Sequence, residues 1–125
     1  MSSIVKDIKT YLTAHGCSTD AIYLNCQPDT PNDLIAITKY GGIPGGLKTE
    51  HRVQVLVRNI SAITAENKIN AIRNLLNPTN PEAVIQLTST RTATIKALQE
   101  PFPLFQDDKN RFKFVCNFRV LSSRD

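Results

Sequence analysis

The chain has 125 residues, of which 41% are hydrophobic, 21% charged and 6% aromatic. This length and composition predict one globular domain over residues 1–125, large enough to fold without disulfides or a structural metal. No apolar run approaches the roughly 20 residues that cross a bilayer, and residues 1–16 alternate charged and apolar side chains, unlike a signal peptide. We therefore expect a soluble, intracellular protein with no membrane contact.

The cysteine content and the charge distribution further limit the kinds of protein that fit this sequence. Cys17, Cys26 and Cys116 are an odd number without a C-x-x-C pair, a pattern that favours small, reduced core residues over a disulfide framework. The formal net charge is +4, and every arginine lies in residues 51–125. This asymmetry predicts one surface that meets an anionic partner, although plain solvation explains such charges equally well.

The first predicted element is an amphipathic helix near the N-terminus. Ser2 or Ser3 can cap it, and Gly16 can end it in the left-handed conformation that glycine adopts at helix ends. Its apolar side chains recur at helical spacing and would form one stripe against a core: Ile4, Val5, Ile8, Tyr11 and Leu12.

Two strands are predicted next. Residues 21–27 alternate in polarity, and residues 28–32, which contain two prolines, end the alternation. Residues 34–40 are apolar on both sides except for Lys39, which is typical of a strand that is covered on both faces.

Four of the five glycines fall in residues 41–46, at the start of a ten-residue connection that ends at Glu50. A tight hairpin needs fewer residues, so we predict a loop that is mobile in the free subunit and becomes ordered against a partner. Its contact groups would be Tyr40, Ile43, Leu47, Lys48 and Glu50.

Two strands are predicted to have a core face and a basic face, because their residues alternate strictly over 52–58 and 111–121. The expected buried residues are Val53, Val55, Val57, Phe112, Phe114 and Phe118, and those expected to project from the other face are Arg52, Arg58, Lys113 and Arg119. All five phenylalanines follow residue 100, so the last strand and residues 102–105 are expected to supply the bulk of the core.

The remaining segments complete the fold prediction. A second helix covers residues 62–76, capped by Asn59 or Ser61 and ended by Asn77-Pro78. Residues 83–87 and 93–98 resemble strands. The order of elements predicts an α+β domain with a mostly antiparallel sheet of about four to six strands and two helices packed on one face.

Catalytic signals are weak throughout. His15, Cys17 and Cys26 fit no zinc spacing, and His51 is isolated at a strand start, where we expect it to face solvent. Asp107-Asp108 belong to a segment typical of a hairpin turn. Residues 41–46 lack the Gly-Lys-Ser/Thr of a phosphate-binding loop. We therefore predict no enzymatic activity, no cofactor and no metal.

Nucleic-acid binding stays open as an alternative function. Residues 111–115 superficially resemble the aromatic strand of an RNA recognition motif, but Phe112 and Phe114 share a face with Cys116 and Val120, which favours core packing. An α+β domain could still bind nucleic acid through a basic sheet face formed by Arg52, Arg58, Arg111, Lys113 and Arg119.

Three segments in the same order carry a family resemblance. Residues 34–42 form a strand ending in Tyr-Gly-Gly, residues 52–58 contain Val-Gln-x-x-Val-Arg, and residues 101–120 contain Pro, Asp-x-x-x-Arg and Asn-Phe. With the N-terminal helix, they resemble the tail terminator or tail-completion proteins of long-tailed bacteriophages, often described as minor capsid proteins. Phe105-Gln106 departs from that pattern, where the family has Leu-Gly.

The resemblance implies a structural virion protein without catalysis. Such a protein assembles in the host cytoplasm as a ring, expected to be a hexamer, on the head-proximal end of the tail tube. It would stop tube polymerisation and join the tail to the head-completion or neck protein, and its basic face would contact neighbouring subunits or DNA passing through the channel. The expected partner contacts are Tyr40, Ile43, Leu47, Lys48, Phe102, Phe105, Asp107 and Asp108.

Overall fold

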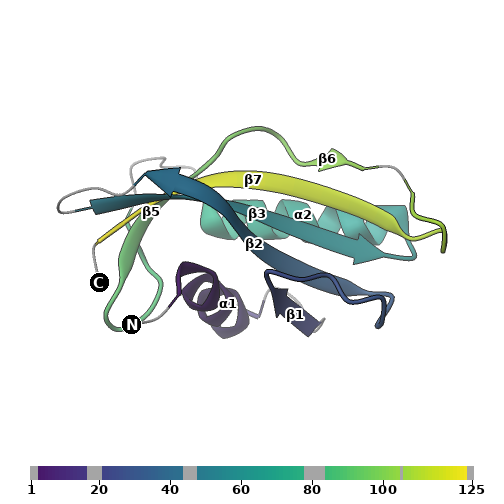
Figure 1. Ribbon diagram of the computed structural model, residues 1–125, viewed down its shortest axis with the longest axis horizontal. Coiled ribbons are helices and arrows are strands. Elements are labelled where there is room, and N and C mark those ends of the chain that lie inside the picture. The colour runs from purple at the N-terminus through teal and green to yellow at the C-terminus, as the bar shows by residue number, and fades with distance from the viewer. Residues whose placement is uncertain (1–2, 17–20, 44–47, 78–83, 105, 124–125) are drawn as a thin grey trace.

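The computed structural model describes residues 3–16, 21–43, 48–77, 84–104 and 106–123, and Figure 1 shows their arrangement. Two helices accompany a curled seven-stranded sheet with the strand order β1-β2-β3-β7-β5-β4, and β6 pairs separately with β7. The elements are α1 (Ile4–Ala14), β1 (Ala21–Leu24), β2 (Leu34–Ile43), β3 (Lys48–Asn59), α2 (Ala62–Leu76), β4 (Ile85–Gln86), β5 (Thr92–Ala97), β6 (Phe102–Pro103) and β7 (Phe112–Ser123).

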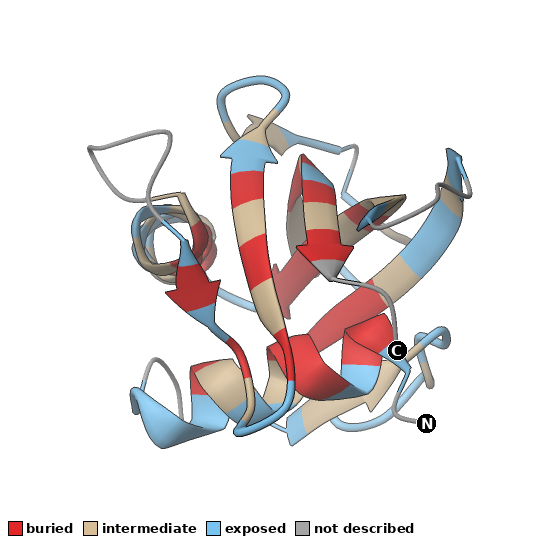
Figure 2. Ribbon diagram, turned by 90° about the vertical axis from the view of Figure 1, so that its left-hand side faces the viewer, coloured by how far each residue is buried: buried red, intermediate tan, exposed pale blue. Residues whose placement is uncertain are grey.

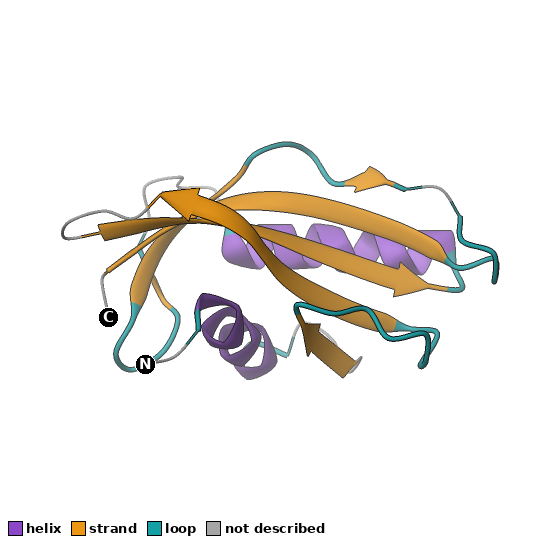
Figure 3. Ribbon diagram, viewed as in Figure 1, coloured by secondary structure: helices purple, strands orange, loops and turns teal. Residues whose placement is uncertain are grey.

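The predicted α+β class is confirmed, with a mixed and mostly antiparallel sheet. Only the β1–β2 pair is parallel among the described strands, and β3 and β7 pair over their full length. Figure 3 shows the two helices beside the long, curved strands, and both helices contribute to one core cluster on the same face of the sheet. We call this the helix face and the opposite side the open face.

The caps of both helices were predictable from sequence. Ser3 caps α1, and its hydroxyl oxygen accepts a hydrogen bond from the Lys6 N–H at 3.4 Å. Gly16 has a φ of 60°, the left-handed conformation expected after a helix end. Ser61 caps α2 in the same way, accepting from the Thr64 N–H at 3.3 Å, and Asn77 ends that helix.

The main core differs from the prediction in its composition. Phe118 is buried as expected, together with the three valines of β3, but Phe112 and Phe114 are only half-buried. The two half-buried rings lie where β7 begins, at the margin of the sheet, so the helices cover them less completely. Aliphatic side chains from the two helices and from β2, β3 and β5 make up most of the core instead, so the expected dominance of phenylalanine was wrong.

A second, smaller cluster covers one end of the open face. It contains Leu34, Ala36, Leu56 and Val115, and the partly buried side chains of Tyr23 and Phe102 pack against it. Figure 2 shows strands on which buried and less buried residues alternate, whereas the first four residues of β2 are all buried. The first half of β2 is therefore covered on both faces, as its continuous apolar run predicted.

Residues 41–43, at the start of the glycine-rich segment, form strand rather than part of a long loop. Gly41 pairs with Arg52, Gly42 with His51 and Ile43 with Glu50, so only residues 44–47, which lie outside the described residues, separate β2 from β3. Gly42 has a φ of 150°, and a Cβ there would overlap the Glu50 carbonyl oxygen. Gly42 thus permits β2 to approach β3 closely, and the pairing register shifts between Lys39 and Gly41. The prediction of a ten-residue connection was therefore wrong.

Candidate functional site

The even-numbered residues of β3 all point to the open face, because side chains alternate between the two sides of a strand. Along β3, they divide this face into three zones. Leu56 lies in the covered apolar cluster. In the middle, the Gln54 amide donates to the Asn117 side-chain oxygen at 3.1 Å. At the far end, Arg52 lies directly opposite Arg119 of β7. The face therefore changes from apolar and covered to charged and exposed.

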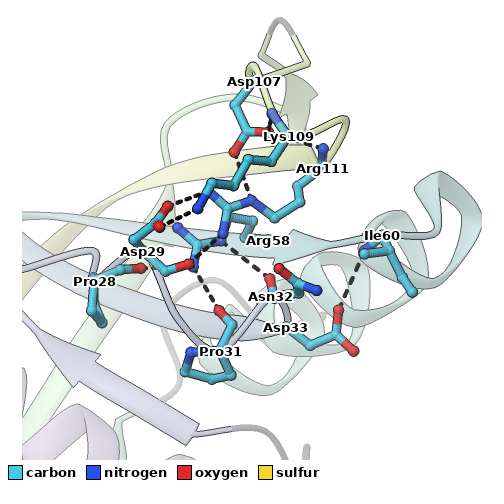
Figure 4. Close-up of polar contacts among 10 residues, drawn as sticks. All are labelled: Pro28, Asp29, Pro31, Asn32, Asp33, Arg58, Ile60, Asp107, Lys109 and Arg111. Atoms are coloured by element: carbon cyan, nitrogen blue, oxygen red, sulfur yellow. Dashed lines mark hydrogen bonds and ion pairs between the residues drawn. The ribbon is translucent and has the colours of Figure 1, made fainter.

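Arg58, at the covered end, was expected to project into solvent but is only 2% exposed. Its guanidinium donates to four backbone carbonyls of one loop (Figure 4): Pro28 at 2.7 Å, Asp29 at 3.2 Å, Pro31 at 2.6 Å and Asn32 at 3.1 Å. Burial lowers the pKa of Arg58, and the charge of Arg111 lowers it further. The prediction was wrong because this loop folds over the residue and supplies acceptors that only the tertiary structure brings there.

Arg111 is also buried, 4% exposed, and binds the same loop. It donates to the Asp29 carbonyl at 2.5 Å and pairs with the Asp29 carboxylate at 3.2 Å and the Asp107 carboxylate at 2.8 Å. Lys109 adds an ion pair with Asp29. We call Arg58 and Arg111, with the loop carbonyls and carboxylates they bind, the arginine clamp.

The Asp107 carboxylate is part of the arginine clamp. Its carboxylate accepts hydrogen bonds from the backbone N–H groups of Lys109 and Arg111, both at 3.0 Å. The Arg111 backbone bond is the largest cause that lowers the pKa of Asp107 to about 2. The predicted turn is confirmed, and Asp108 is exposed within it. Asp107, which was expected to contact a partner, has its contacts within the chain.

The other end of the sheet carries the exposed groups. We use the name distal hairpin for residues 40–43 of β2 with residues 48–52 of β3. Tyr40 is 51% exposed and Ile43 64% exposed, and Lys48 is also exposed. Glu50 pairs with Arg52 at 3.1 Å and with Arg119 at 2.5 Å. The hydrogen bond from Arg119 is the main cause that lowers the pKa of Glu50.

The outer edge of β2 is only partly paired. β1 pairs with β2 from Leu34 to Ile37, and the Asn25 side chain then accepts from the Lys39 N–H at 3.1 Å. Beyond that point, the described residues place no strand beside Tyr40–Ile43 on this edge. An edge of this kind presents backbone N–H and C=O groups that can pair with another chain.

The predicted partner contacts therefore separate into two regions. Tyr40, Ile43 and Lys48 lie at the distal hairpin, whereas Phe102, Asp107 and Asp108 lie near the clamp at the opposite end of the strands (Figure 1). The eight residue steps from Glu50 to Arg58 span about 26 Å, at about 3.3 Å per step along a strand. Leu47 and Phe105 lie outside the described residues.

The predicted basic face is smaller than the sequence suggested. Arg58 and Arg111 are buried in the clamp, and Lys113 is half-buried beside Arg58. Arg52 and Arg119 are more open and share the Glu50 carboxylate. Lys96, which the sequence reasoning missed, pairs with Arg119 in register. The polarity alternation of β5 over residues 92–97 could have identified it.

Two further expectations about reactive side chains were wrong. His51 is half-buried on the helix face because it shares the alternation of Val53, and burial lowers its pKa. Cys26 is exposed, whereas Cys116 is buried as expected and burial raises its thiol pKa to about 11. Cys17 lies outside the described residues, which contain no group of three or more histidines, cysteines or acidic residues placed to hold a metal.

The fold and its exposed features define a class of protein: an α+β domain in which one edge of β2 is incompletely paired among the described residues. A model of the bacteriophage tail terminator protein family matches residues 11–122, which include every described strand except the last residue of β7, and the chain belongs to this family. A search of curated proteins finds no match.

Family membership fixes the general role of the protein. Members of the tail terminator family are structural, non-enzymatic proteins that end assembly of the tail tube, and the chain is a phage tail component in contact with that tube. The resemblance inferred from the three sequence segments is confirmed. Among the described residues, neither helix is long and apolar enough to cross a membrane.

Proposed function

We propose that the protein forms a ring, with six subunits, on the head-proximal end of the tail tube, where it stops tube growth and joins the tail to the neck of the filled head. The observation that carries the proposal is the unpaired β2 edge at Tyr40–Ile43. Ring closure needs a heterologous contact, in which one surface of each subunit meets a different surface of the next. An open strand edge is well suited to be one of those two surfaces.

The side chains at this edge support a contact between proteins. Ile43 and Tyr40 are among the large hydrophobic side chains that stay exposed, and they lie close together on one strand. Lys48 and the Arg52–Glu50–Arg119 group border them with charge. Apolar groups with a charged margin are typical of protein interfaces. The proposed contact is thus the distal hairpin, where backbone pairing gives affinity and the two side chains add buried apolar area.

The arginine clamp stabilises the end of the sheet that is opposite the distal hairpin. Arg58 lies on the same strand as Glu50 and fixes the loop of residues 28–33 against the end of the sheet that is remote from the hairpin. We infer that the Asp107–Asp108 turn, which lies at the end of the sheet remote from the distal hairpin, contacts a partner other than the neighbouring subunit, either the tail tube or the neck. Asp108 and the exposed Leu104 are the groups available there.

A role in DNA passage is also part of the proposal, in a reduced form. Arg52, Arg119 and Lys96 would face the channel and contact phosphates in a salt-dependent way. The alternative of a free nucleic-acid-binding domain has lost support, because two of its five basic residues are buried and two others share a carboxylate. We therefore propose no independent nucleic-acid-binding function.

The experiment that tests the ring proposal compares two exposed isoleucines. Ile43→Asp places a charge at the β2 edge, and Ile63→Asp places the same charge on α2, where Ile63 is 72% exposed. Light scattering after gel filtration, together with negative-stain images, should show rings for the native chain and for Ile63→Asp, and monomers for Ile43→Asp. Rings formed equally by both variants would refute the proposed contact.

A further inference from the structure

A cavity opens on the helix face beside the N-terminal end of α1. Its volume is about 380 Å³, and it lies between the start of α1, the residue that follows β1, Lys39 of β2, His51 of β3 and the residue that precedes β5. Seven residues line it: Ser3, Ile4, Val5, Asn25, Lys39, His51 and Arg91. It shares His51 with the distal hairpin and contains no residue of the arginine clamp.

Positive charge dominates the polar part of this cavity. Lys39 of β2 and Arg91, which directly precedes β5, both line the cavity. Burial is the main cause that lowers the pKa of His51, and the charges of Lys39 and Arg91 lower it further. Asp7 of α1 pairs with Arg91 at 3.3 Å, and both side chains are almost fully buried. No acidic side chain of the described residues lines the cavity itself, so Lys39 and His51 have no acidic partner there among these residues.

His51 supplies an independent observation. Its Nδ1 atom is buried and has no hydrogen-bond partner among the described residues, although buried polar atoms are normally paired. An imidazole nitrogen can donate when it carries the proton, and a lysine ammonium donates as well. Two donor side chains that line one cavity with excess positive charge match an acceptor that carries negative charge.

We propose that this cavity binds a small oxyanion, a carboxylate or a phosphate, held between His51 and Lys39 with Arg91 behind them. The ligand would accept from the His51 ring and from the Lys39 ammonium. The first backbone N–H groups of α1, next to Ser3 and Ile4, add a favourable dipole. This inference does not depend on ring formation.

The proposal predicts a linkage between anion binding and the protonation of His51. The groups that face the imidazole are Lys39 from β2, Arg91 from the start of β5, and Ser3 and Asn25, with Asp7 of α1 behind Arg91. A bound anion offsets the positive field, so it favours the imidazolium and raises the pKa of His51. Binding must therefore become tighter as the pH falls through the pKa of His51.

The chain offers a direct readout, because it contains only two histidines. His15 lies at the C-terminal end of α1, exposed to solvent, with its Nδ1 2.8 Å from the Tyr11 carbonyl. Nuclear magnetic resonance of the imidazole C–H groups in the full chain follows both at once. Sodium acetate and inorganic phosphate are the two probes, each compared with sodium chloride at equal ionic strength.

The expected result is a saturable shift of the His51 resonance and a rise of its pKa by about one unit, equivalent to about tenfold tighter binding to the protonated form. The His15 resonance should stay unchanged. Lys39→Gln should weaken binding and raise the pKa of His51 in the absence of probe, whereas Lys9→Gln, at a lysine of α1 that does not line the cavity, should do neither. Equal shifts of both histidines, no shift with either probe, or undiminished binding in Lys39→Gln would overturn the proposal.

Discussion

Arg58 and Arg52 lie on the same strand and the same face, yet their surroundings differ completely. Arg58 is buried and donates to four loop carbonyls, whereas Arg52 is more than a third exposed and pairs with one carboxylate. The difference comes from the loop of residues 28–33, which folds over one end of the open face and leaves the other end bare. One end of the sheet is therefore fixed by internal contacts, and the other is available to partners.

The largest expected effect is the loss of Arg58. Arg58→Ala leaves several buried carbonyls without donors and removes a charge-assisted network, so the free energy of unfolding should fall by about 3 kcal/mol or more. Arg52→Ala is the matched control, because an exposed ion pair contributes little. Urea denaturation of both variants measures the difference. Equal losses of stability would contradict the assignment of Arg58 to a structural clamp.

A substitution at Gly42 should have the next largest effect. Gly42→Ala introduces a Cβ that overlaps the Glu50 carbonyl oxygen at a backbone φ that side chains rarely adopt, so we expect a loss of about 1–3 kcal/mol in unfolding free energy. Gly41→Ala has open space around its Cβ and should change stability much less. Thermal unfolding of the pair tests whether the hairpin requires glycine only at Gly42.

The pH dependence of stability probes the clamp through Asp107. Its folded-state pKa of about 2 lies below the ordinary value of 3.8, so the native state binds fewer protons than the unfolded chain. The stabilisation is complete above the unfolded pKa and is lost as the pH falls through 2. Urea unfolding between pH 5 and 2 should show a shallower decline for Asp107→Asn than for the native chain. The exposed neighbour variant Asp108→Asn is the control, and a decline unchanged in Asp107→Asn would contradict this role.

The smallest effect on stability is expected at Glu50. Glu50→Gln releases Arg52 and Arg119 at the exposed end of the sheet, so the melting temperature should hardly change. The open face becomes more positive, however, and retention on a DNA column at low salt should increase. If retention is unchanged, these arginines do not face a surface that DNA can reach.

Much of the fold could be predicted because it depends on local patterns. The alternation of Val53, Val55 and Val57 gave the core face of β3, and Ser3, Ser61 and Gly16 gave the helix ends. The same alternation, followed two residues back, would have placed His51 on the helix face. In these segments the local period decides which side of the element meets the core.

The candidate site was less predictable because it depends on contacts between distant segments. Nothing near Arg58 in the sequence indicates that carbonyls about 30 residues earlier will surround it. The glycines in residues 41–43 suggested a flexible loop, but glycine also permits two paired strands to approach closely. Only the observed pairing with β3 distinguishes a loop from a strand here. Alternation shows which face a residue occupies, and tertiary structure decides whether that face is covered.

The most direct test of the proposed function is a cryo-electron microscopy reconstruction of the protein bound to assembled tail tubes. The account predicts a ring at one end of each tube, in which Tyr40–Ile43 of one subunit lies beside a strand of the next subunit. Density spread along the tube, or a ring in which the β2 edge faces solvent at every subunit boundary, would contradict it.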